Sequence, residues 1–188
     1  MALYNVLTLK ALEWRKNNYQ SDYPIISEIM EFNLDPSTGN LRFLRKAQFE
    51  ALENYWYLRL VEETPHIFDL YKKFYNDEDL LNALNIKLSD EDWKKIALSG
   101  KGINSIFERI KNDNDFVKKY KLDALRETLL LSYPSYILAL AMGAGKTILI
   151  GAIIATEFAM ALEYPEDSPR EIVYDSSQGK HGDKNARR

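Results

Sequence analysis

The 188-residue chain contains no cysteine and only two histidines, His66 and His181. Without cysteine, a disulfide framework, a zinc–thiolate site and a thiol nucleophile are all excluded. Two histidines so far apart in the sequence do not favour a histidine-based metal site or a Ser-His-Asp triad. The absence of cysteine fits a reducing compartment, so we expect a cytoplasmic protein.

The sequence also lacks an excess of basic residues. Its 28 Asp and Glu residues outnumber 25 Lys and Arg residues, which gives a net charge of -3. A small nucleic-acid-binding module usually has the opposite balance. Lysines do gather at Lys111, Lys118, Lys119 and Lys121. Contact with DNA and a solvated helix face are both open for this cluster, and the acidic balance favours the solvated face.

No segment has the sequence expected of a membrane anchor. The N-terminus has no basic start followed by an apolar core and a small-residue cleavage site. An uncharged stretch at 128–145 is interrupted by Ser-Tyr-Pro-Ser at 132–135, and the apolar residues after it are broken by Lys146 and Glu157. We therefore expect two buried elements here and no membrane partner.

What the sequence has in abundance is helical periodicity. Hydrophobic residues make up 46% of the chain and aromatic residues 12%, enough for a packed core. Apolar side chains at three- and four-residue steps predict a helix over about residues 41–60 that ends before Pro65. Its expected apolar stripe consists of Leu44, Ala47, Ala51, Tyr55 and Leu58.

Further helices are expected over about residues 64–131. Two acidic strings, 77–79 and 90–92, imitate the second acidic motif of motor ATPases, but both precede the glycine-rich segment and neither follows an apolar strand. Acidic residues are favoured in the first turn of a helix, so we interpret both strings as helix starts. Ser89 and Asp92 have the spacing of a capping box.

The character of the sequence changes after residue 131. The apolar run Tyr136–Ala141 predicts a short buried strand, followed by a glycine turn and a helix from Lys146 to about residue 162. This helix is apolar nearly all round, so we expect it to be covered on more than one side. Residues 171–175 predict the start of a second strand, and residues 176–188 form a polar tail.

The segment Met142-Gly143-Ala144-Gly145-Lys146-Thr147 carries the most specific chemistry. Glycines allow a tight turn whose amides point at one anion, and the positive end of the following helix faces the same point. Lys146 would reach the β- and γ-phosphates of ATP, and the Thr147 hydroxyl would ligate Mg²⁺. The alternative is an ordinary turn with a solvated lysine, although a lysine there opposes the helix dipole.

This segment resembles motif I of superfamily-two helicases and translocases, particularly the restriction subunit of type III restriction enzymes. Those families often carry a Leu-Arg-x-x-Gln segment before motif I, which here matches Leu44-Arg45-Lys46-Ala47-Gln48. The resemblance implies that Gln48, with Arg45 beside it, binds the nucleotide and that Gln48 reads the adenine edge. It further implies ATP and Mg²⁺ as cofactors, and double-stranded DNA and a modification (methyltransferase) subunit as partners.

Two features depart from the family pattern. Leu140 stands where the general pattern opens with Gly or Ala, and Gln48 precedes Lys146 by 146 - 48 = 98 residues. The resemblance therefore requires residues 64–131 to be a helical insertion. Three regions follow, namely a helical N-terminal region (1–131), the first strand, P-loop and helix of a RecA-like motor (132–175), and the polar tail (176–188).

The expected fold class is mostly α with the start of an α/β RecA-like unit whose sheet is incomplete in this chain. We interpret the chain as the N-terminal part of an ATP-dependent DNA translocase, with Lys146 as its catalytic lysine and the remainder of the motor domain as a partner. No later acidic motif is found, so we expect no ATP hydrolysis by this chain alone. The alternative is a helical protein-interaction module whose glycine turn binds no nucleotide.

Overall fold

The computed structural model describes residues 1–166, apart from the side chains of Asp77 and Ile103. Within this range the chain is helical, with ten α-helices and one π-helical turn, η1. A single isolated bridge joins Leu34 to Leu41. The helices are α1 (Leu3–Lys16), α2 (Pro24–Phe32), α3 (Lys46–Trp56), η1 (Tyr57–Val61), α4 (Ile67–Phe74), α5 (Asp77–Ala83), α6 (Asp90–Leu98), α7 (Ile103–Asn112), α8 (Asn114–Tyr120), α9 (Asp123–Leu130) and α10 (Lys146–Glu163).

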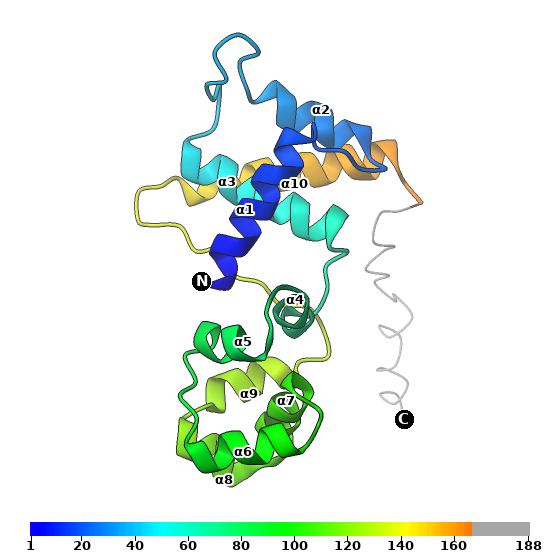
Figure 1. Ribbon diagram of the computed structural model, residues 1–188. Helices are drawn as coiled ribbons and strands as arrows, with labels where there is room; N and C mark the ends of the chain where they lie inside the picture. Colours follow the sequence, from blue (N-terminus) through cyan, green and yellow to red (C-terminus); the bar gives the residue numbers. More distant parts are fainter. Residues whose placement is uncertain (167–188) are drawn as a thin grey trace, which may run out of the picture.

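The helices form two groups that share one hydrophobic core. Helices α1, α2, α3 and α10 pack together at one end of the molecule, and α5 to α9 lie at the other, with α4 between them (Figure 1). Residues 131–145 run from the second group back to the start of α10. No helix within residues 1–166 is both long enough and apolar enough to cross a bilayer.

The predicted strand at Tyr136–Ala141 is wrong, and with it the RecA-like unit. Residues 131–145 form neither strand nor helix, and Ile137 is 90% exposed. A strand is stabilised by backbone hydrogen bonds to a neighbouring strand. No backbone hydrogen bond joins residues 136–140 to any other described residue. The run is held instead by its side chains, because Tyr136 and Leu140 pack against the core and the Tyr136 hydroxyl donates to the Pro65 carbonyl. The second predicted strand and the polar tail lie outside the described residues.

The most buried face of helix α3 lies one position away from the predicted stripe. The buried side chains are Gln48, Phe49, Leu52, Glu53 and Trp56. Of the predicted stripe, Leu58 is buried in η1, three members are half-buried against the core (Leu44, Ala51 and Tyr55), and Ala47 is exposed. Phe49, Leu52 and Trp56 also recur at helical spacing, and large aromatic side chains remove more apolar area from water than alanines do.

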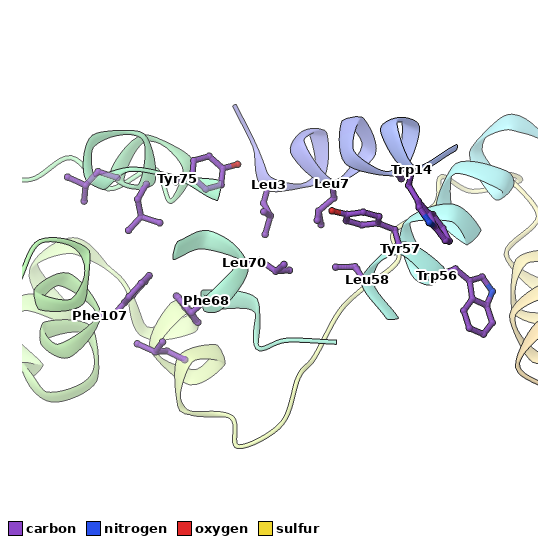
Figure 2. Packing of buried hydrophobic residues seen from close by; sticks show 14 of the residues in the cluster. Leu3, Leu7, Trp14, Trp56, Tyr57, Leu58, Phe68, Leu70, Tyr75 and Phe107 are labelled. Atoms are coloured by element: carbon purple, nitrogen blue, oxygen red, sulfur yellow. The ribbon is translucent and has the colours of Figure 1, made fainter. Parts of the chain in front are cut away.

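Buried Glu53 is the polar link between α3 and α1. Its Oε1 accepts hydrogen bonds from Arg15 Nε at 2.6 Å and from the Tyr19 hydroxyl at 2.7 Å, and Arg15 Nη2 pairs with its Oε2. A bidentate guanidinium offsets the cost of burying the carboxylate. Around this link, Leu3, Leu7 and Trp14 of α1 face the side chains of η1 and α4 (Figure 2).

Helix α10 is covered on one side only, which corrects the prediction that it would be enclosed. Leu149, Thr156 and Met160 are buried where α10 packs on α2 and α3. On another face, four large apolar side chains are more than half exposed. They are Ile150, Ile154, Phe158 and Leu162. An apolar stripe of this length on a helix is typical of a surface that packs against something else.

The acidic strings begin helices, as predicted. The Asn76 side chain accepts a hydrogen bond from the Asp79 amide at 2.9 Å, and Ser89 Oγ accepts one from the Asp92 amide at 3.4 Å. The Asp92 carboxylate does not complete a reciprocal box. It accepts from Lys119 at 2.7 Å and Arg109 at 2.9 Å, so one lysine of the basic cluster is neutralised within the fold.

We predict that Gly151→Ala stabilises the protein. Gly151 lies inside α10, is exposed, and has no heavy atom within 4 Å of the position that a β-carbon would occupy. Alanine is favoured over glycine in a helix interior by about 0.5–1 kcal/mol. Thermal denaturation should show a higher Tm for the variant. A Tm below that of the wild type would mean that the α10 backbone is not helical at this position.

We also predict that Asp92→Asn destabilises the fold by roughly 1–3 kcal/mol at neutral pH. Hydrogen bonds from Lys119, Arg109 and Tyr120 hold the pKa of the Asp92 carboxyl well below its usual range. Ionised Asp92 therefore stabilises the folded state above its unfolded pKa, near 4, and this stabilisation is lost as the pH falls. Urea unfolding at pH 7 and pH 3 should show a smaller loss of stability in the variant. Equal losses in the two proteins would exclude this role.

Candidate phosphate-binding turn

The segment between residue 141 and α10 is a tight turn with two left-handed glycines. Gly143 has φ of 76° and Gly145 has φ of 80°, a region that residues with a β-carbon rarely adopt. The Ala144 amide donates to the Ala141 carbonyl at 3.2 Å, which closes the turn. Gly145 is the N-cap of α10 and Lys146 its first residue, so the turn delivers the chain directly into the helix.

The start of α3 holds this turn through three consecutive carbonyls. Gln48 Nε2 donates to the Ala144 carbonyl at 2.8 Å and to the Gly145 carbonyl at 3.2 Å. Arg45 Nη1 lies 3.4 Å from the Gly143 carbonyl. The two residues of the predicted glutamine motif are thus brought to the glycine turn across 98 residues of sequence, Gln48 by two direct hydrogen bonds.

These contacts, together with the bonds from the Ile148 and Leu149 amides to the Gly145 carbonyl, fix the direction of the turn's amides. Every peptide bond in the described chain is trans, and in a trans peptide the carbonyl of one residue points opposite to the amide of the next. Because the Ala144 and Gly145 carbonyls point at Gln48, the Gly145 and Lys146 amides point away from it. Among the described residues, the amides of Gly143, Gly145, Lys146 and Thr147 have no hydrogen-bond acceptor.

Gly145 is also required for a steric reason. A β-carbon at this position would lie 2.2 Å from Gln48 Nε2, far inside van der Waals contact. At Gly143 a β-carbon would meet no atom within 4 Å. The approach of Gln48 to the turn therefore depends on glycine at 145 and not at 143.

The charged and hydroxyl groups of the turn face solvent. Lys146, Thr147 and Arg45 are exposed, and neither basic side chain forms an ion pair within residues 1–166. Lys146 stands at the positive end of the α10 dipole, where a cation is unfavourable in the absence of an anion. Met142 is almost fully exposed and contributes no polar group.

Past its middle, α10 is anchored to α3 and η1 as well. Trp56 Nε1 donates to Thr156 Oγ1 at 2.9 Å in the buried contact, and Arg59 Nη2 lies 3.0 Å from Glu157 Oε2. The Tyr55 hydroxyl also bonds to Glu157. From the sequence, Glu157 was noted only as a charge that interrupts the apolar residues, and Thr156 was not noted, although a polar pair in an otherwise apolar helix is a signal that could have identified this contact.

The structure thus brings together all the sequence-predicted site residues of the turn with Gln48 and Arg45, but not the strand that was expected to precede them. Within the described part of the chain, no three His, Cys, Asp or Glu side chains are grouped so as to hold a metal ion. The only oxygen ligand predicted for Mg²⁺ from this chain is the Thr147 hydroxyl.

Comparison of the chain with protein-family models, with curated proteins and with solved structures gives no match.

We predict that Gly145→Ala destabilises the folded protein more than Gly143→Ala does. Both variants force alanine into the left-handed region, at a cost of about 1–2 kcal/mol. Only Gly145→Ala also displaces Gln48 and leaves the Ala144 carbonyl without its donor, which adds roughly 1 kcal/mol or more. Denaturant unfolding of the two variants measures the difference directly. Equal losses of stability would show that Gln48 does not contact Gly145 in solution.

Proposed function

We propose that the turn Gly143–Thr147 binds the phosphate groups of ATP. The observation that carries this proposal is a set of four amides, at Gly143, Gly145, Lys146 and Thr147, that have no acceptor among residues 1–166. They lie at the start of an 18-residue helix, beside the Lys146 ammonium, which forms no ion pair in the same range. Amides that converge on a helix N-terminus are a general anion-binding arrangement.

Each group of the turn has a separate task in this proposal. The amides donate hydrogen bonds to phosphate oxygens, and the α10 dipole adds roughly half a positive charge at the same place. The Lys146 ammonium neutralises the outer phosphates. The Thr147 hydroxyl is the group that would hold Mg²⁺, which neutralises phosphate charge when bound.

The wider assignment rests on the sequence resemblance. It makes the chain the N-terminal part of an ATP-dependent DNA translocase similar to a type III restriction subunit, in which α4 to α9 form the helical insertion. Double-stranded DNA, a methyltransferase subunit and the remainder of a motor domain are its proposed partners, and the cytoplasm is its proposed location. The turn in this account is held by a helix, α3, and not by a sheet.

A second candidate is a helical protein-interaction module whose turn binds no nucleotide. The exposed apolar face of α10, formed by Ile150, Ile154, Phe158 and Leu162, favours it. The two candidates differ in one measurable property, the affinity of the turn for phosphate.

We predict that Lys146→Ala weakens binding of Mg·ATP by at least tenfold, because a charge-assisted contact to phosphate is lost. Lys46→Ala is the control, since Lys46 is also exposed and is also the first residue of its helix, α3, where it pairs with Glu50 at 3.8 Å. Removing either lysine relieves an unfavourable interaction with a helix dipole. Lys146→Ala should therefore be no less stable without nucleotide, and in Lys46→Ala this gain offsets the loss of the exposed ion pair. Isothermal titration calorimetry measures the affinities and thermal denaturation the stabilities.

The two candidate functions give opposite results in this experiment. Phosphate binding at the turn requires that the wild type and Lys46→Ala bind Mg·ATP with similar affinity while Lys146→Ala does not. If no protein binds Mg·ATP or Mg·ADP at millimolar concentration, the proposal fails and the interaction module is favoured.

A further inference from the structure

We propose that Gln48 is a positioning residue that orients the turn, and that it does not read the nucleotide base. This inference rests on the proposed phosphate-binding function. It replaces the adenine-reading role expected from the sequence with one argued from the contacts of the Gln48 amide.

The polar atoms of the Gln48 side chain are already engaged. Its Nε2 carries two hydrogens, and these are directed to the carbonyls of Ala144 and Gly145. Its Oε1 accepts from the Arg45 amide at 2.8 Å, which also caps the start of α3. An amide that binds the adenine edge needs one free donor and one free acceptor, and in this arrangement Gln48 has no free donor.

The burial of the Gln48 side chain also argues against a base-reading role. Gln48 is 1% exposed, so a base could reach its amide only if the turn moved away from α3. That movement would break both carbonyl contacts in a part-buried site, and a polar group left unpaired there is costly. Holding the turn and reading the base are therefore mutually exclusive tasks for this side chain.

The positioning role has a definite chemical consequence. By holding the Ala144 carbonyl, Gln48 turns the Gly145 amide outward, toward the place proposed for phosphate. Its second contact supports the Gly145 carbonyl, which also accepts from the Ile148 and Leu149 amides of α10. Loss of the Gln48 side chain should then weaken the binding of every polyphosphate ligand, whatever base the ligand carries. A base-reading glutamine would instead discriminate adenine from guanine.

The test compares Gln48→Ala and Gln48→Glu with the wild type. Gln48→Glu keeps the size of the side chain but replaces Nε2 with an oxygen. This oxygen cannot donate to the Ala144 and Gly145 carbonyls and is repelled by them. Gln20→Ala and Gln20→Glu are matched controls, because Gln20 is exposed and its side chain forms no hydrogen bond with a described residue. For each protein, calorimetry gives the affinities for Mg·ATP, Mg·GTP and inorganic tripolyphosphate, and NMR gives the amide shifts of Gly143 to Thr147 without ligand.

We expect both Gln48 variants to bind all three ligands about tenfold more weakly than the wild type, with the same loss for each ligand. A loss of this size corresponds to one to two hydrogen bonds. Without ligand, the Gly145 and Lys146 amide resonances should shift in these variants and not in the Gln20 controls. Loss of ATP affinity alone, with GTP and tripolyphosphate unchanged, would overturn the inference. Unshifted turn amides would overturn it too, even if the wild type binds none of the ligands and the proposed function itself has failed.

Discussion

The contact between α3 and α10 is the constraint on which the candidate site depends. Helix α3 holds α10 at two places, through Gln48 at the glycine turn and through Trp56 at Thr156, past the middle of α10. Arg59, in the π-helical turn that follows α3, adds an ion pair to Glu157. Helix α3 is itself fixed to α1 by the buried Glu53–Arg15 pair. A turn that would be irregular by itself is therefore positioned by a helix whose own place is set in the core.

This arrangement orients the amides of the turn without a β-sheet beside it. The side chain of Gln48 orients the peptide plane between Ala144 and Gly145, and it shares the next plane with the first backbone hydrogen bonds of α10. Planarity of the peptide bond then sends the opposite amides outward. Gly145 is required because Gln48 approaches so closely, and Lys146 follows at the end of the helix dipole. The polar anchors at Thr156 and Glu157 matter because α10 carries few other polar groups to define its rotation against α3.

Local sequence signals predicted much of the fold, and contacts distant in sequence explain the rest. The start of α10 at Lys146 and the helix starts after Asn76 and Ser89 follow from capping residues and turn glycines, which act within a few residues. The strand at Tyr136–Ala141 failed because an apolar run becomes a strand only beside another strand. The buried face of α3 was missed because Ala47 and Phe49 both fit helical periodicity, and packing against α1 and α10 decides between them. Gln48 was selected from a motif, but its burial against Ala144 could not be foreseen from spacing.

The most direct test of this account is an NMR titration of the isotope-labelled wild-type chain with Mg·ATP, with every backbone amide followed at once. We expect the largest shift changes at Gly145, Lys146 and Thr147, whose amides lack partners among the described residues, and small changes along the rest of α3 and α10. Shift changes centred elsewhere, or none at millimolar nucleotide, would contradict the claim that α3 holds this turn ready for phosphate.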